Sequence, residues 1–198
     1  MNDVGVVIVC YNTDDIIVNA VESIYKYVDV VYIVDNSDEN NDCFRVCDEL
    51  SNKYENVLVH HTKENIGHGL GLNTGINNIN TKHIICMDSD TVLIEPNLIN
   101  EMMQILENDS VYGCGRVLKL NGFDYLYLPF CMFKRDTFFK YSPFIHDGAP
   151  FRKTMNEIKN KKKIVQIPDF KKKIFHRGRS TREIAGHWRK GFGGKSGV

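Results

Sequence analysis

Apolar runs of strand length alternate with segments of helical periodicity along the first 60 residues, and this alternation limits the folds open to the chain. The apolar runs cover 4–10 and 30–34, and each ends in polar residues. Between them, the apolar positions of 16–25 recur at the spacing of an amphipathic helix. A further helix over 42–53 and a strand over 56–60 follow. Such alternation predicts an α/β fold with a doubly wound, mostly parallel sheet flanked by helices, and a ligand site at the strands' carboxyl ends.

Two carboxylates follow another predicted buried strand. The run from His83 to Met87 contains adjacent isoleucines and leads directly into Asp88, Ser89 and Asp90. Carboxylates one residue apart at a buried strand end repel each other and are costly to desolvate unless a cation lies between them. Mg²⁺ or Mn²⁺ takes oxygen ligands and leaves positions for substrate phosphates. The triplet therefore predicts a site for a divalent cation and a diphosphate, with a solvated turn or a helix cap as the alternative.

Three glycines at alternating positions, Gly67, Gly69 and Gly71, precede a helix predicted to continue to Asn80. Glycines let the backbone approach a ligand closely, and the first N–H groups of a helix can face an anion. The order Gly-x-Gly-x-x-Gly of a dinucleotide fingerprint does not occur. A flexible loop before a poor helix start is the alternative.

The second half of the sequence predicts further helices and strands. Pro96 suits the first turn of a helix whose apolar stripe belongs to the core. Strands over 110–118 and 125–133 are predicted to be joined by a turn at Asn121-Gly122. The remaining predicted elements are a short helix after 134–136, a loop over 141–151, a polar helix to about 161 and a strand over 164–167.

Composition and length indicate one ordinary globular domain, because the 198 residues are 42% hydrophobic and 25% charged. No apolar run has the length of a membrane span and the start does not resemble a signal peptide, which predicts a cytoplasmic protein. The cysteines form no Cys-x-x-Cys pair, so buried free thiols are predicted, with zinc or disulfides as the alternative. They are Cys10, Cys43, Cys47, Cys86, Cys114 and Cys131.

Charge is divided unevenly along the chain. Residues 1–151 contain 10 Lys and Arg against 22 Asp and Glu, whereas 152–198 contain 15 against 3. The basic segment can contact nucleotide phosphates, an anionic membrane, a polyanionic acceptor or the acidic body of the domain. Ile184 and Trp188 would share a helix face among cationic side chains, which is typical of peripheral contact with the inner face of a membrane. Docking of Trp188 on the domain is the alternative. Nucleic acid is not predicted, because no zinc finger or RNA-binding signature occurs.

In combination, these segments resemble a known family. Val-Ile-Val-Cys-Tyr-Asn at 7–12, Val-Asp-Asn-Ser at 34–37, Glu-Asn-Ile-Gly at 64–67 and Asp-Ser-Asp-Thr at 88–91 are similar to motifs of the family 2 glycosyltransferases, especially the rhamnosyltransferase-like branch. The resemblance implies a metal-dependent, inverting transfer of a sugar from a nucleoside diphosphate sugar, the donor, to an acceptor nucleophile.

The resemblance also implies the domain organisation. A single GT-A domain would cover 1–180, with a Rossmann-like nucleotide-sugar half over 1–95 and a compact acceptor half over 96–180. The remaining residues, 181–198, would form a basic tail.

The same resemblance implies roles for individual residues. Tyr11 would pack on the nucleobase and Asp35 would hydrogen-bond it. Asp90, together with Asp88 and His176, would bind Mn²⁺ or Mg²⁺, with a structural role for His176 as the alternative. The implied nucleotide-binding residues are Val9, Tyr11, Asp35, Asn65, Gly67, Asn73 and Asp88.

The chain departs from this pattern at the general base. Rhamnosyltransferase-like members carry Gly-Glu-Asp-x-Asp before the penultimate helix, whereas 146–148 reads His-Asp-Gly. Asp147 is the sole acid between Asp136 and Glu157, so it is the residue to which the resemblance assigns catalysis. A turn aspartate is the structural alternative. The missing acidic pair leaves a catalytically impaired sugar-nucleotide-binding protein as an alternative function.

Two other classes are less consistent with the sequence. A receiver-like signalling domain shares strand-end aspartates, but it is shorter and does not explain the Asn-Ile-Gly segment. A nucleotidyltransferase would open with a Gly-rich, basic phosphate loop, which the Tyr-Asn-Thr of 11–13 does not resemble. Arg177 and Arg179 are candidate phosphate contacts or solvated tail residues. The nucleobase, the sugar and the acceptor, whether glycan, lipid-linked or peptide, stay open.

Overall fold

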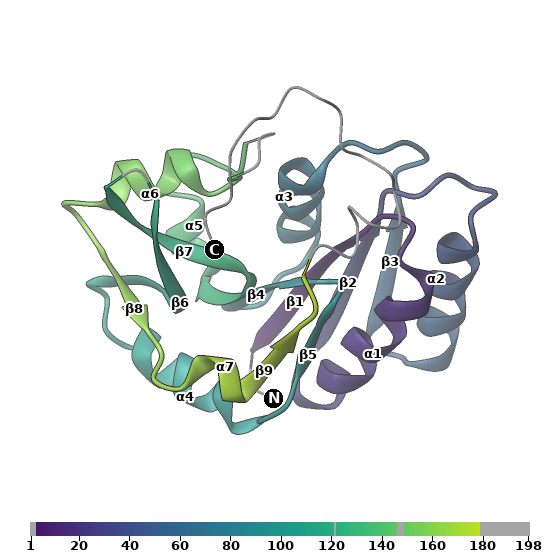
Figure 1. The fold of residues 1–198 in the computed structure, drawn as a ribbon, viewed down its shortest axis with the longest axis horizontal. Helices are drawn as coiled ribbons and strands as arrows, with labels where there is room; N and C mark the ends of the chain where they lie inside the picture. The colour runs from purple at the N-terminus through teal and green to yellow at the C-terminus, as the bar shows by residue number, and fades with distance from the viewer. Residues whose placement is uncertain (1–2, 121, 146–148, 179–198) are drawn as a thin grey trace.

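The computed structural model describes residues 3–120, 122–145 and 149–178. Seven strands form one sheet in the order β3-β2-β1-β4-β7-β6-β8 (Figure 1). Neighbours are parallel except β7, which runs antiparallel to β4 and β6. The strands are β1 (Val4–Cys10), β2 (Val30–Asp35), β3 (Val57–His61), β4 (His83–Asp88), β6 (Val111–Leu120), β7 (Phe123–Lys134) and β8 (Lys163–Gln166). The predicted mostly parallel sheet is therefore confirmed.

Helices cover both faces of this sheet. They are α1 (Asp14–Ile24), α2 (Asp42–Lys53), α3 (His68–Asn78), α4 (Asn97–Leu106), α5 (Arg135–Phe138), α6 (Arg152–Ile158) and α7 (Phe170–Lys173), with a 3₁₀ turn at Tyr25–Tyr27. Successive strand residues point to opposite faces, so Ile8 and Cys10 join one core while Val7 and Val9 join the other. The first core is covered by α1, α2 and α4, and the second by α3, α5 and α6.

Several predicted elements lie close to their expected positions. Helix α2 has the predicted bounds, and α3 ends two residues before the predicted Asn80. All six cysteines are buried, as predicted. No helix in the described part of the chain combines the length and apolar character needed to cross a membrane.

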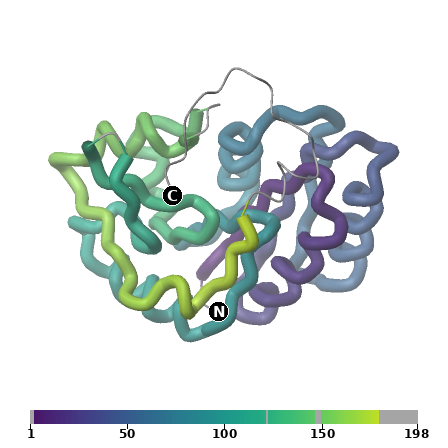
Figure 2. The backbone as a smooth tube through the Cα atoms, in the orientation of Figure 1, coloured from purple at the N-terminus to yellow at the C-terminus, as the bar shows by residue number. Residues whose placement is uncertain are grey.

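A small second sheet is not predicted by the sequence. Strand β5 (Thr91–Leu93) pairs antiparallel with β9 (Ile174–His176), so that Thr91 lies opposite His176. Figure 2 shows the last described part of the chain returning alongside β5. Three-residue strands are too short to show a hydrophobic period, which explains why this pairing escapes sequence analysis. Its consequence is that His176 is carried to the carboxyl end of β4.

The glycines of α3 let this helix lie close to the sheet. A Cβ atom on Gly75 would lie 2.3 Å from a methyl group of Val7, and one on Gly71 would lie 2.9 Å from a methyl group of Val9. Both distances are shorter than real Cβ contacts, so a side chain at either position would push α3 away from β1. At these two positions the glycines therefore serve helix-to-strand packing.

Candidate functional site

Asp88, Asp90 and His176 lie together where β4 ends. His176 Nε2 is 3.1 Å from Asp90 Oδ1 and 3.6 Å from Asp88 Oδ2. One ligand atom from each of the three residues lies within 4.8 Å of the others. Asp88 is the last residue of β4, while the pairing of Thr91 with His176 brings the imidazole alongside. The structure thus brings together the three residues predicted to bind a metal, and we call them the acidic site.

Electrostatics in the acidic site favour a positive charge. Burial lowers the pKa of His176, but hydrogen bonds to Asp88 and Asp90 and the charges of both carboxylates outweigh burial and raise it to about 9. Without a cation, a protonated His176 therefore balances part of the carboxylate charge, and a bound cation would take the place of this proton. The backbone also fixes this position, since Arg177 N–H donates to the Asp90 carbonyl oxygen at 3.1 Å.

The donor set of the acidic site fits a divalent cation. Carboxylate oxygens are the ligands that Mn²⁺ and Mg²⁺ prefer, and imidazole is a common ligand of transition metals. Asp90 is buried and the other two side chains are partly exposed, so ligands are positioned by the fold while one side stays open to a substrate. The three side chains could therefore hold a cation and leave coordination positions for a diphosphate.

Two further side chains contact the acidic site, and the sequence analysis predicts neither of them. His68 Nε2 is 3.5 Å from Asp88 Oδ1, and the Tyr127 hydroxyl oxygen is 3.3 Å from His176 Nδ1. A partner on the second ring nitrogen fixes the orientation of a metal-binding histidine. His68 opens α3 and Tyr127 lies on β7, so neither contact follows from spacing along the chain.

The predicted nucleobase contacts lie at the ends of β1 and β2. Val9 on β1 is buried and is paired with Asp88 on β4. Tyr11 lies just beyond the end of β1 and is half-buried. Asp35 is fully buried, and its carboxylate accepts a hydrogen bond from Ser37 N–H at 3.0 Å. Its other oxygen is 2.9 Å from a ring nitrogen of His61. The Asp35 carboxylate thus has partners within the protein, and its contact with a nucleobase stays a prediction.

The predicted residues of the glycine segment have distinct local roles. Asn65 Oδ1 accepts a hydrogen bond from Gly67 N–H at 2.9 Å, and Gly67, the N-cap residue just before α3, has a φ of 87°. That left-handed backbone favours glycine. Asn73 makes two bonds to Phe144, donating to its carbonyl oxygen at 2.9 Å and accepting from its N–H at 3.0 Å. Asn73 thereby fixes the backbone just before 146–148.

Asp147 and Arg179 lie outside the described residues, as does the tail over 181–198. The two ends of the loop that contains Asp147 are held together, since Ile145 N–H donates to the Pro150 carbonyl oxygen at 3.0 Å. Gly69 lies against this loop end, because a Cβ atom there would be 2.2 Å from the Ile145 carbonyl oxygen. The loop therefore starts and ends beside the first turn of α3.

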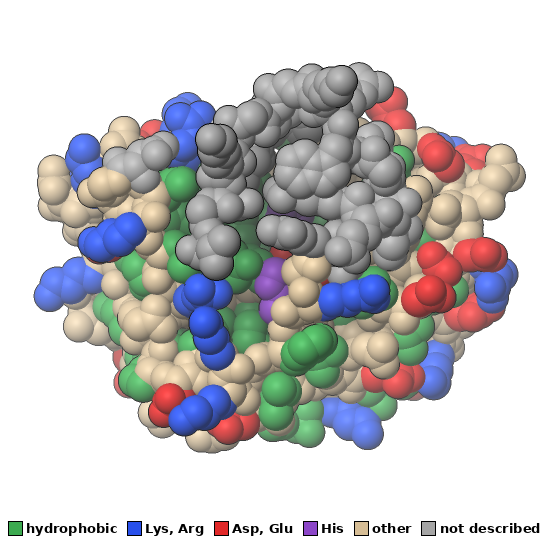
Figure 3. Space-filling model, in the orientation of Figure 1, with side chains coloured by type: hydrophobic (Ala, Val, Ile, Leu, Met, Phe, Trp, Pro, Cys, Tyr) green, Lys and Arg blue, Asp and Glu red, His purple; other side chains and the backbone are tan. Residues whose placement is uncertain are grey.

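The surface is also polarised. In Figure 3 histidine side chains lie in the middle of the face, acidic side chains gather over α1 and α2, and Lys and Arg are more numerous over α6 and β8. On this face, the described residues therefore show part of the charge asymmetry of the sequence.

Solved structures with a related fold were found by structural comparison. The mannosyltransferase PcManGT from Pyrobaculum calidifontis, in complex with GDP-Man and Mn²⁺, matches with a TM-score of 0.72 and 15% identity over 85% of this chain and 55% of that chain. S. aureus TarS 1-349 in complex with UDP-GlcNAc matches with a TM-score of 0.64 and 15% identity over 84% of this chain and 56% of that chain. The chain thus spans little more than half the length of either neighbour.

At this identity the structural matches establish a shared fold, and the predicted GT-A type architecture is confirmed. A search of curated protein sequences gives no match. The family model described as "Glycosyltransferase like family 2" matches residues 2–150. Since that match covers the sheet strands β1 to β7 and the carboxylates of the acidic site, the chain belongs to the glycosyltransferase-like family 2.

Proposed function

We propose that the chain transfers a sugar from a nucleoside diphosphate sugar to an acceptor nucleophile, with inversion at the anomeric carbon and with Mn²⁺ or Mg²⁺. The observation that carries this proposal is the convergence of Asp88, Asp90 and His176 at the carboxyl end of β4. The neighbours in complex with GDP-Man and Mn²⁺ and with UDP-GlcNAc support the donor class. More specifically, we propose a hexosyl or deoxyhexosyl transferase of the rhamnosyltransferase-like branch, on the basis of the motifs at the strand ends.

On the donor side, the reaction requires stabilisation of the negative charge on the leaving diphosphate. The leaving diphosphate becomes more negative as the glycosidic bond breaks, and a cation held by Asp88, Asp90 and His176 would supply Lewis-acid stabilisation. Tyr127 keeps the His176 ring oriented. Arg177 is exposed directly after β9, where its guanidinium can donate to a phosphate.

The acceptor side requires a base, and we assign this role to Asp147. Its carboxylate takes the proton of the acceptor hydroxyl while that oxygen attacks the anomeric carbon opposite the diphosphate, which inverts the configuration. The bonds between Asn73 and Phe144 support this assignment, because they fix the preceding backbone against α3, and α3 begins at His68 beside Asp88. The donor half is then 1–95 and the acceptor half 96–180.

A panel of donors tests the proposed function. Thermal shift with nucleoside diphosphates and their sugars, with and without Mn²⁺, should give one nucleotide whose stabilisation requires the cation. A ligand at a hundred times its Kd adds about 2.7 kcal/mol to native stability. Turnover of that donor with candidate acceptors should then give product of inverted anomeric configuration by NMR.

Each result that differs from this expectation would contradict a specific part of the proposal. Stabilisation that does not depend on Mn²⁺ would remove the cation from the proposal. Binding of a nucleotide sugar without turnover would instead support the sugar-nucleotide-binding alternative, while stabilisation by nucleoside triphosphates would favour a nucleotidyltransferase.

Peripheral contact with the inner face of a membrane is also part of the proposal. It rests on the sequence of 180–198, in which Arg182, Arg189 and Lys190 surround Ile184 and Trp188. The full chain should float with anionic vesicles and not with neutral ones, and deletion of 180–198 should remove this binding. If the full chain stays unbound even at low salt, the tail has another role.

A further inference from the structure

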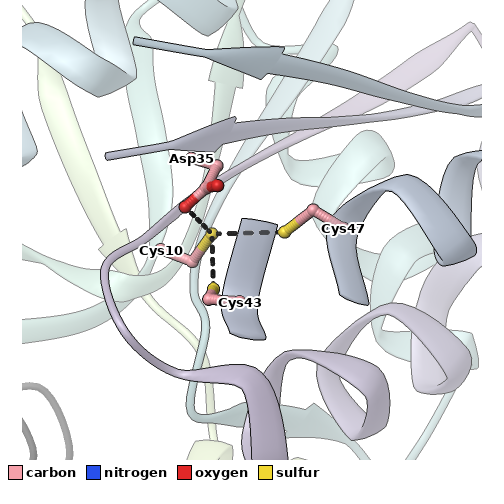
Figure 4. Close-up of side chains that lie close together, drawn as sticks. All are labelled: Cys10, Asp35, Cys43 and Cys47. Atoms are coloured by element: carbon pink, nitrogen blue, oxygen red, sulfur yellow. Dashed lines mark hydrogen bonds between the residues drawn. The ribbon is translucent and has the colours of Figure 1, made fainter. Parts of the chain in front are cut away.

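Three of the six cysteines lie together with a carboxylate, on the α2 side of the sheet (Figure 4). Cys10 Sγ is 3.7 Å from Cys47 Sγ, 3.8 Å from Cys43 Sγ and 3.5 Å from Asp35 Oδ1. The four ligand atoms all lie within 4.8 Å of one another. Each of the four residues is at most 1% exposed. We call these four residues the cysteine cluster.

The fold builds the cysteine cluster from three elements. Cys10 and Asp35 are the last residues of β1 and β2, and they lie opposite each other in the parallel pairing of these strands. Cys43 and Cys47 are four residues apart on α2, so their side chains share one helix face, which is turned toward the sheet. This arrangement has no Cys-x-x-Cys signature, which is why sequence spacing alone does not reveal it.

The three separations measured from Cys10 match those of a tetrahedral site. With zinc bonds of about 2.3 Å to sulfur and about 2.0 Å to oxygen, tetrahedral angles place two sulfurs about 3.8 Å apart and a sulfur and an oxygen about 3.5 Å apart. The three distances around Cys10 agree with these values. We propose that Cys10, Cys43, Cys47 and Asp35 bind Zn²⁺ as a structural site.

The surroundings of the cysteine cluster suit such a cation. A buried carboxylate beside three ionisable thiols is costly unless positive charge compensates it. His61 contacts the second oxygen of Asp35 at 2.9 Å, and its other ring nitrogen is 3.0 Å from Asp48, so a hydrogen-bonded outer shell is already in place. Cys43 lies in the first turn of α2, where the helix dipole favours a thiolate.

A cation here would connect elements that carry donor-side residues. Val9 directly precedes Cys10, and Tyr11 directly follows it. Bound Zn²⁺ would therefore fix the ends of β1 and β2 against α2. This inference does not depend on transferase activity, because its ligands are separate from the acidic site.

Metal content and the spectrum of a cobalt form test the cysteine cluster. The full chain is produced in minimal medium with Zn²⁺ or with Co²⁺, desalted, and measured by plasma mass spectrometry and absorption spectroscopy. We expect about one tightly held cation per chain, and for Co²⁺ the thiolate charge-transfer and visible ligand-field bands of a tetrahedral site. The Asp90→Ala variant should keep these bands, because the acidic site contains no sulfur.

Matched cysteine variants locate the site. Cys47→Ser should lose or shift the bands and lower the melting temperature of the zinc form, because a structural cation contributes directly to folding. Cys114→Ser is the control, since Cys114 is equally buried but contacts the Met102 carbonyl oxygen instead of the cysteine cluster. It should keep bands and metal content unchanged.

Three results would overturn the inference. One is wild-type chain that holds no cation and shows no cobalt–thiolate band. Another is a Cys47→Ser variant with an unaltered spectrum. The last is a disulfide between two residues of the cysteine cluster in natively purified chain, detected by non-reducing peptide mass spectrometry. If Cys47→Ser does not fold, the metal content and band intensity of the wild type decide alone.

Discussion

Asp90→Ala is expected to abolish cation-supported donor binding and turnover while the chain still folds. The substitution removes the carboxylate that lies 3.1 Å from His176 and leaves two of the three ligands of the acidic site. Loss of an outer-shell partner alone typically costs about tenfold to a hundredfold in metal affinity, so loss of a direct ligand should cost more. The backbone bond from Arg177 to Asp90 does not need the side chain, so the thermal unfolding profile should stay close to wild type.

Calorimetric titration with Mn²⁺ and donor turnover measure this effect. Asp124→Ala is a matched control, because Asp124 is an exposed acid on β7 that pairs with Lys119, and its loss should leave both measurements unchanged. Full activity of Asp90→Ala, or wild-type activity that survives EDTA, would show that the acidic site does not hold a catalytic cation.

Asp147→Asn should keep donor affinity and lose transfer to the acceptor. An amide has nearly the shape of a carboxylate but does not accept the acceptor's proton, and a general base contributes about a hundredfold to ten-thousandfold. The loss should therefore appear in kcat, whereas the Kd for the donor with Mn²⁺ stays near that of the wild type.

Asp136→Asn provides the comparison, because Asp136 is an exposed acid in the first turn of α5. This variant should transfer sugar at the wild-type rate. A parallel loss of donor affinity and transfer in Asp147→Asn would assign Asp147 a structural role in its loop, and full transfer would exclude it as the base.

Most elements and the fold class can be predicted from local patterns in the sequence. Hydrophobic periodicity is local, so the buried strand ending at Asp88 and the bounds of α2 can be predicted from residues a few positions apart. Alternation of strands and helices then restricts the topology to a mostly parallel sheet, whose strand ends collect candidate ligands. Asp88 and Asp90 are only two positions apart in the sequence, so their proximity in space can be predicted from the sequence.

Contacts between residues that are far apart in the sequence become visible only in the folded chain. His176 reaches Asp90 through the pairing of β5 with β9, and these strands are too short to carry a periodic signal. The spacing of the glycines suggests that the backbone approaches a ligand closely. The structure shows instead that Gly75 is needed because α3 lies close to β1. Cys10 meets Cys47 because strand register and helix packing place them together. Contacts of this kind depend on how the elements pack, and no spacing along the chain encodes that packing.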